Sequence, residues 1–308
     1  MLNSIKYATV QFVWKIIDKL AEKQAKGAVL PPGSKLIADI PYKNTGLMAH
    51  LLDVYYPQDT RDPLPVIIYI HGGGFLAGDK LHTRQYCMTL SQYGYCVVNL
   101  NYRLAPEHKN PAAIEDVFSA MAWVRDNCHH YHGDSNRLIL AGDSAGAYLA
   151  GLAAAICTNS KLAGQHGLDV PVAPENIRGV LLFSGLFDPV TAATRKFIGI
   201  KADIELYMGT NISESPSLDH YSVIKNITPG FPPALISSGQ IDGLHPESEA
   251  LSADLSKNNV WHRTLFFAKS EKKGFHCYQQ HLSLDTAKQC MEHVRGFLAD
   301  VLKEDEGM

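Results

Sequence analysis

The sequence predicts one large α/β domain with a mostly parallel, eight-stranded sheet flanked by helices. Short apolar runs that resemble strands alternate with longer segments of helical periodicity, a pattern typical of parallel sheets covered on both faces. Most of these runs lack polar alternation, as expected for strands that are buried on both sides. A chain of 308 residues is also long enough to bury a substantial core.

The expected elements follow in order along the chain. The first two strands are separated by a turn at Gly46 and are predicted to form a hairpin. Strands are expected over 35–40, 51–56, 66–70, 96–100, 138–141, 179–183, 234–238 and 263–268. Helices are expected over 83–93, 112–127, 145–157, 247–258 and 284–302. After the hairpin, intervening helices leave room for the crossovers that parallel strands require.

Two segments interrupt this alternation and are predicted to form a helical cap. Apolar side chains recur at helical spacing near the N-terminus, and we expect them to pack on the protein's own body rather than on a membrane surface. Residues 188–233 are rich in Ser, Pro, Asn and Asp, and insertions of this length are usually functional. The predicted organisation is an N-terminal cap helix (1–30), a core (31–187 and 234–308) and a second cap insertion (188–233).

Composition excludes several classes of partner. The formal net charge is −3 and the pI about 6.5, so neither nucleic acid nor an anionic membrane surface is an expected ligand. No apolar segment approaches the ~18 residues of a membrane span, and no signal-peptide pattern is evident, which predicts a cytoplasmic protein. The six cysteines form no C-x-x-C pair and are predicted to be free thiols.

A glycine-flanked serine is the strongest local signal of chemistry. The pattern Gly-Asp-Ser-Ala-Gly at 142–146 follows an apolar run and precedes a helical stretch of small residues. Glycines allow a sharp turn between strand and helix, which leaves the hydroxyl of Ser144 at the top of the turn. The following helix directs its free backbone N–H groups toward the same point. Ser144 is therefore predicted to be a nucleophile, with Asp143 bracing the turn.

A second glycine-rich loop can supply the groups that stabilise negative charge. The run His-Gly-Gly-Gly-Phe at 71–75 follows another apolar run. Residues without a Cβ bring backbone N–H groups close to a developing oxyanion. The predicted oxyanion donors are Gly72, Gly73, Gly74 and Ala145, while His71 is expected to order the loop by hydrogen bonding.

A serine nucleophile needs a base, and the base needs an orienting acid. In α/β-hydrolases the acid and then the histidine follow the serine, on loops after later strands. Asp242 follows the strand at 234–238, and His276 follows the strand at 263–268. Of the fourteen histidines, His245, His262 and His281 are placed less well in this order. The predicted catalytic residues are thus Ser144, Asp242 and His276.

These motifs resemble those of the hormone-sensitive-lipase-like family of α/β-hydrolase esterases. The match extends over roughly residues 50–300 and includes Asn-Tyr-Arg-Leu-Ala-Pro-Glu-His at 101–108 and Pro-Ala-Ala-Ile-Glu-Asp at 111–116. The resemblance implies hydrolysis of short- to medium-chain carboxylic esters without a cofactor or metal, a two-part cap, and the option of a homodimer. We rate Arg103 and Glu107 as structural and expect them to pair with each other.

The sequence departs from this family at the histidine and leaves some alternatives open. The family often has His-Gly-Phe, whereas here Gly274 and Phe275 precede His276, so a rigid alignment would put Lys273 in the place of the base. A non-catalytic ligand-binding protein, an amidase and a thioesterase on the same scaffold remain alternatives to an esterase. The predicted substrate-binding residues are Phe75, Leu76, Phe187, Ile204, Tyr207 and Met208.

Overall fold

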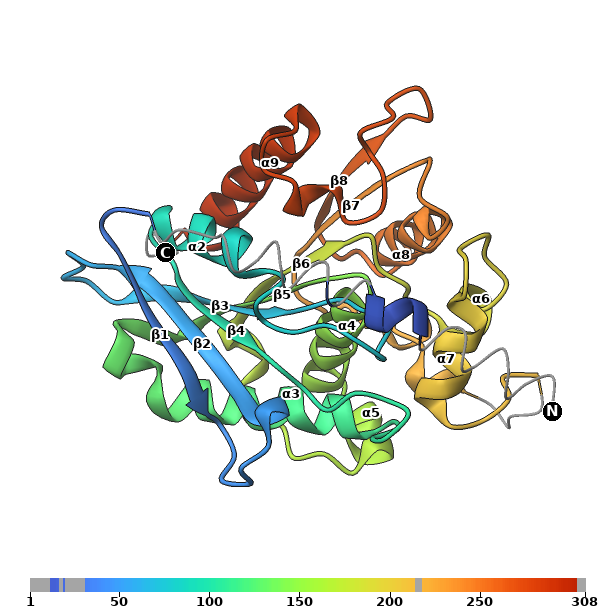
Figure 1. Cartoon of the computed structure of the whole chain (residues 1–308), viewed down its shortest axis with the longest axis horizontal. Helices are drawn as coiled ribbons and strands as arrows, with labels where there is room; N and C mark the ends of the chain where they lie inside the picture. Colours follow the sequence, from blue (N-terminus) through green and yellow to red (C-terminus); the bar gives the residue numbers. More distant parts are fainter. Residues whose placement is uncertain (1–11, 17–18, 20–30, 214–217, 304–308) are drawn as a thin grey trace.

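The computed structural model describes residues 12–16, 19, 31–213 and 218–303 (Figure 1). Its core is an eight-stranded sheet in the order β1-β2-β4-β3-β5-β6-β7-β8. The strands are β1 (Ser34–Pro41), β2 (Leu51–Pro57), β3 (Leu64–Ile70), β4 (Cys96–Leu100), β5 (Gly133–Asp143), β6 (Ile177–Phe183), β7 (Ala234–Gly239) and β8 (His262–Phe267). β1 and β2 form the predicted antiparallel hairpin, and β2 is also antiparallel to β4. The strands from β3 to β8 run parallel, which confirms the predicted fold class.

Helices cover both faces of this sheet. They are α2 (Arg84–Gln92), α3 (Ala112–Asn127), α4 (Ala145–Thr158), α5 (Ser160–His166), α6 (Pro189–Ala192), α7 (Ile200–Met208), α8 (His245–Lys257) and α9 (Asp285–Val301). The core on one face includes α3, α4 and α8, whereas α2 and α9 pack on the other face. In β3, Ile68 faces the first core and Ile67 the second, and neither is exposed. Burial on both sides explains why this strand shows no polar alternation.

The second predicted cap insertion contains the helices α6 and α7, as expected for a helical cap, although its weak periodicity did not indicate where they lie. Asp188 caps the N-terminus of α6, because its side chain accepts hydrogen bonds from the backbone N–H groups of Val190 and Thr191, both at 2.9 Å. Pro189 occupies the first turn of this helix, where its missing N–H costs nothing. Of the predicted N-terminal cap helix, Phe12–Ile16 are helical, and most of the remainder lies outside the described residues. The predicted domain boundaries stay predictions.

A buried glutamate fastens this insertion to the core. Glu247 on α8 is completely buried, and its carboxylate accepts a hydrogen bond from Arg195 Nε at 2.7 Å. The backbone N–H groups of Phe187 and Asp188 donate to the same side chain at 3.2 and 3.1 Å. The start of the insertion is therefore tied to the helix that follows Asp242.

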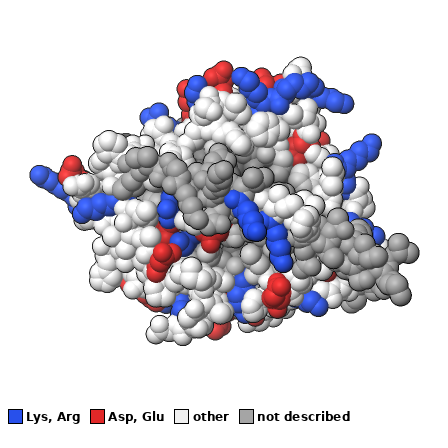
Figure 2. Space-filling model, in the orientation of Figure 1, with Lys and Arg blue, Asp and Glu red and all other residues white. Residues whose placement is uncertain are grey.

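Charged side chains on the surface are mixed rather than segregated. Figure 2 shows basic and acidic residues interspersed on the visible face, which agrees with the small net charge. Within the described ranges, no helix has both the length and the apolar character needed to cross a membrane.

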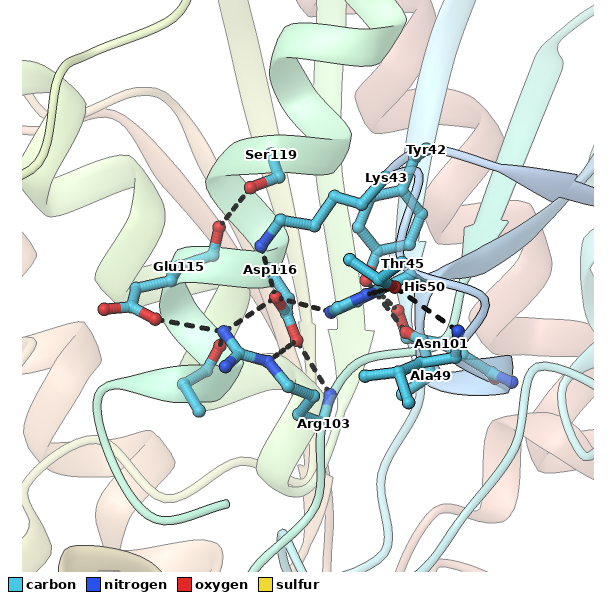
Figure 3. Close-up of polar contacts among 12 residues, drawn as sticks. Tyr42, Lys43, Thr45, Ala49, His50, Asn101, Arg103, Glu115, Asp116 and Ser119 are labelled. Atoms are coloured by element: carbon cyan, nitrogen blue, oxygen red, sulfur yellow. Dashed lines mark hydrogen bonds and ion pairs between the residues drawn. The ribbon is translucent and has the colours of Figure 1, made fainter.

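Asp116 on α3 is the centre of a second buried polar network (Figure 3). Its fully buried carboxylate contacts Arg103 Nε at 2.7 Å, Lys43 Nζ at 2.9 Å and His50 Nε2 at 3.1 Å. Burial would raise the pKa of Asp116, but the hydrogen bonds from Arg103 and Lys43 lower it overall. The expected pairing of Arg103 with Glu107 is wrong: Arg103 pairs instead with Asp116 and Glu115, because α3 brings these two acids beneath it.

Replacing Asp116 with asparagine is expected to lower the free energy of unfolding by about 3 kcal/mol, because it leaves Lys43 without its counter-ion and Arg103 with only the more exposed Glu115. Urea denaturation at neutral pH measures this change. Asp126→Asn is the control: its pair with Arg125 is exposed on both sides, and a much smaller effect is expected. Equal losses for the two variants would contradict the importance of the buried network.

Candidate active site

Ser144 lies in a strained turn between β5 and α4. Its backbone has φ 53° and ψ −119°, and its N–H donates to the carbonyl of Phe183 at 2.8 Å. The turn depends on Gly146, because a Cβ at this position would come 2.0 Å from the carbonyl oxygen of Ile70. Only glycine therefore lets α4 approach the end of β3 this closely. The result is a serine hydroxyl presented at the carboxyl edge of the sheet.

The other two predicted catalytic side chains meet Ser144 at this edge. Ser144 Oγ lies 3.0 Å from His276 Nε2, and His276 Nδ1 lies 2.8 Å from Asp242 Oδ2. Asp242 comes from the loop between β7 and α8, and His276 from the loop between β8 and α9. The structure thus joins the three side chains in one hydrogen-bonded chain, with Asp242 behind the imidazole.

The alternative bases lie elsewhere. His245 Nδ1 contacts Ser238 Oγ at 2.7 Å, and His262 Nε2 contacts Ser252 Oγ at 2.9 Å. His281 follows the short helical turn after His276, and Lys273 is exposed. Among these candidates, His276 is the residue whose imidazole reaches the serine.

The environment of Asp242 keeps its carboxylate ionised. Burial would raise the pKa of this group, but interaction with His276 and the N–H of Leu244 at 2.9 Å lower it overall. A carboxylate in this state accepts a hydrogen bond from the Nδ1–H group of the His276 imidazole. His276 then presents its other nitrogen to the serine as an acceptor.

Asp143 braces the turn, as expected, and contacts a residue that the sequence did not indicate. Its buried carboxyl group accepts hydrogen bonds from Tyr69 Oη at 2.9 Å and from Cys277 Sγ at 3.5 Å. Cys277 has φ 56°, and its N–H donates to Ser184 Oγ at 3.2 Å. Burial raises the pKa of the Cys277 thiol well above its usual value, so this thiol is not an activated nucleophile.

The glycine-rich loop is held from behind by the segment that follows β4. Tyr102 Oη donates to the carbonyl of His71 at 2.9 Å, and the rings of these two residues stack at 4.4 Å. The N–H of Ala105 donates to the carbonyl of Phe75, also at 2.9 Å. His71 Nδ1 contacts the carbonyl oxygen of Gly72 at 2.7 Å, as expected for a residue that orders the loop.

Most of the predicted substrate-binding residues are buried, and three of them lie on α7 of the insertion. Phe75 and Tyr207 stack with ring centroids 3.9 Å apart, and Phe187 and Ile204 are also buried. Leu76 and Met208 are half-buried. Their contact with substrate stays a prediction.

One cap residue that the sequence did not indicate touches the candidate base. The ring of Phe197, between α6 and α7, lies 4.6 Å from the imidazole of His276, centroid to centroid. The two residues are far apart in the sequence, and no local pattern marks such a contact. The cap is therefore in direct contact with the imidazole.

No cluster of side chains in the described part of the chain has the composition of a metal site. The site places a serine, an imidazole and a carboxylate next to each other. A glycine-rich loop and the start of α4 bring backbone N–H groups to the same place. That set is suited to nucleophilic attack on a carbonyl carbon.

A family model and a curated relative both match this chain. The family model described as BD-FAE matches residues 52–257, more than half of the chain. Carboxylesterase NlhH of Mycobacterium tuberculosis is 31% identical over 225 residues, which cover 67% of this chain and 65% of that protein. The match thus spans slightly under two thirds of that relative's own length.

Solved structures extend the similarity to almost the whole chain. Esterase B from Lactobacillus rhamnosis (HN001) has a TM-score of 0.86 and 25% identity, and the match covers 97% of this chain and 96% of that one. A structure of the same esterase with a C4-C4 SN3 tributyrin phosphonate has a TM-score of 0.84 with the same identity and coverage. The chain therefore belongs to the BD-FAE family, with the α/β-hydrolase fold, and the resemblance to hormone-sensitive-lipase-like esterases is confirmed.

Proposed function

We propose that this protein is a serine carboxylesterase that hydrolyses short- to medium-chain esters through an acyl-enzyme. The observation that carries the proposal is the hydrogen-bonded chain from Ser144 through His276 to Asp242, with steps of 3.0 and 2.8 Å. Names of similar proteins support it: one is a carboxylesterase, and another is an esterase bound to a phosphonate. Phosphonates of this kind imitate the tetrahedral intermediate of ester hydrolysis.

In this mechanism His276 Nε2 accepts the proton of Ser144 while Oγ attacks the ester carbonyl carbon. The carbonyl oxygen gains the negative charge, and the alcohol oxygen leaves after taking the proton back from His276. Water then repeats the sequence on the acyl-serine and releases the acid. Asp242 holds the imidazole in the required orientation and stabilises its charged form in both halves.

The negative charge is placed where fixed dipoles can stabilise it. We assign the oxyanion donors to the backbone N–H groups of Gly72, Gly73, Gly74 and Ala145. Ala145 begins α4, so the positive end of the helix dipole lies beside the reacting carbon. Losing one such donor typically costs about 10²–10³ in rate.

The homodimer, the location and the preference for esters are not carried by the geometry of the triad. The homodimer and the cytoplasmic location stay predictions. Because a complete triad serves esters, amides and thioesters alike, the preference for esters rests on the relatives and on the easier departure of an alcohol.

Replacing Ser144 with alanine is expected to lower the turnover of p-nitrophenyl butyrate by at least about 10⁴-fold, because the nucleophile is lost.

Asp242→Asn is expected to lower kcat by a similar factor, because the amide favours the wrong imidazole tautomer. Both variants should keep the circular dichroism spectrum of the wild type. A fluorophosphonate probe should label the wild type at Ser144 and leave Ser144→Ala unlabelled.

A panel of p-nitrophenyl esters of increasing acyl length, with an amide and a thioester beside it, defines the substrate class. The highest kcat/KM is expected for short and medium acyl esters. Near-wild-type turnover by the Ser144→Ala protein would overturn the mechanism. The absence of both turnover and probe labelling in the wild type would favour a non-catalytic ligand-binding protein instead.

His71 makes the stability of the glycine-rich loop depend on pH. Burial lowers the pKa of His71 from 6.5 to about 4, although the contact with the Gly72 carbonyl opposes this shift. The unfolded chain therefore binds a proton that the folded chain rejects. The free energy of unfolding is therefore highest above pH 6.5 and falls as the pH drops toward 4. The total loss from this residue is about 3 kcal/mol.

Urea denaturation of the wild type and of His71→Gln between pH 7 and pH 4 measures this contribution. Glutamine still donates to a carbonyl but does not titrate, so the variant should lose less stability over this interval. His129→Gln is the control, because His129 is exposed. Parallel pH profiles for the wild type and His71→Gln would contradict the assignment.

A further inference from the structure

A buried carboxyl group beside the glycine-rich loop has no cationic partner among the residues that the structure describes. Asp203, in the first turn of α7, is 1% exposed. It accepts a hydrogen bond from Trp14 Nε1 at 3.1 Å, and no ion pair to it occurs within the described residues. The lysine of the same helix, Lys201, is paired with Glu205 at 3.7 Å. Buried carboxylates are usually paired, because the charge is costly to bury alone.

This carboxyl group and the indole of Trp14 border the same point of the loop. A Cβ at Gly74 would lie 2.7 Å from Trp14 Cζ2 and 3.0 Å from Asp203 Oδ2. Both side chains therefore contact the backbone of a proposed oxyanion donor. One turn beyond Asp203, Tyr207 stacks on Phe75, which fixes α7 against the loop. A substrate whose carbonyl oxygen binds at Gly74 would bring its neighbouring atoms to this carboxyl group.

An unpaired carboxylate at this place has a chemical consequence. Burial raises the pKa of Asp203 to about 7, although the bond from Trp14 opposes this shift. When ionised, the group repels the negative charge that develops on the nearby carbonyl oxygen. A positive charge on the substrate would remove this repulsion and give the carboxylate a partner. The adjoining indole adds a surface that attracts organic cations.

We propose that Asp203 and Trp14 form a subsite for an ammonium group, so that the preferred substrates are esters with a positively charged nitrogen a few bonds from the ester carbonyl. The proposal rests on the proposed esterase function and narrows its substrate class. The competing explanation is that Asp203 serves only to hold Trp14 in place. Asp203→Asn separates the two, because asparagine can still accept the Trp14 hydrogen bond but carries no charge.

The test compares esters that differ only in replacing a quaternary nitrogen with carbon. For the alcohol side the pair is butyrylcholine and 3,3-dimethylbutyl butyrate, and for the acyl side it is betaine ethyl ester and ethyl 3,3-dimethylbutanoate. The measured quantity is the ratio of kcat/KM, cationic over neutral, at about pH 8.5, where Asp203 is ionised. Dividing the wild-type ratio by that of Asp203→Asn cancels the different intrinsic reactivities of the esters.

For at least one pair, the ratio should fall by about tenfold or more in Asp203→Asn, as expected for the loss of a buried charge contact. Glu205→Gln is the matched control, because its side chain leaves α7 on a different face, and it should keep the wild-type ratio. Trp14→Phe retains the charge and an aromatic face, so it should keep most of the preference. An unchanged ratio in Asp203→Asn for both pairs would overturn the subsite and leave the esterase function intact.

A binding measurement keeps the subsite testable even if no ester is hydrolysed. Titration calorimetry with tetramethylammonium chloride is applied to Ser144→Ala and to the double variant with Asp203→Asn. Saturable binding that weakens about tenfold or more in the double variant supports the subsite. Equal or absent binding in the two proteins contradicts it, whatever the outcome with esters.

Discussion

The close approach of α4 to the ends of β3 and β5 is the constraint on which the site depends. Gly146 sits so near the carbonyl of Ile70 that no side chain fits there, and the turn before it holds Ser144 at positive φ. This geometry turns one serine toward the sheet edge and points the start of a helix at the same place. Buried small residues along α4 make the approach possible, since they let the helix lie close to the sheet.

The loops around this turn are held by polar contacts rather than by regular structure. Asp116 secures the segment that backs the glycine-rich loop, and Glu247 secures the insertion next to Asp242. Both carboxylates are completely buried, and each interacts with an arginine and with at least one backbone N–H group. Each therefore converts a flexible connection into a fixed support, which a catalytic geometry defined within fractions of an ångström requires.

Much of this arrangement could be read from the sequence because its causes are local. The eight strands show as apolar runs, and Ser144 is marked by its flanking glycines. Asp242 and His276 follow from their order after later strands, since parallel strands end at one edge. Contacts between segments that are distant in the sequence produce no local pattern, so they could not be predicted. The partner of Arg103 was misjudged because helix α3 decides it. The bounds of α7 could not be predicted, because the insertion that contains this helix has only weak periodicity.

The contact of Phe197 with His276 makes the acid–base group part of the cap's own packing. An aromatic ring against the imidazole excludes water from one side of it, and it does so only while the insertion rests in this position. Displacement of the segment between α6 and α7 would remove this ring and expose that side of the imidazole to water. The packing of the insertion therefore sets how much water can surround the imidazole of His276.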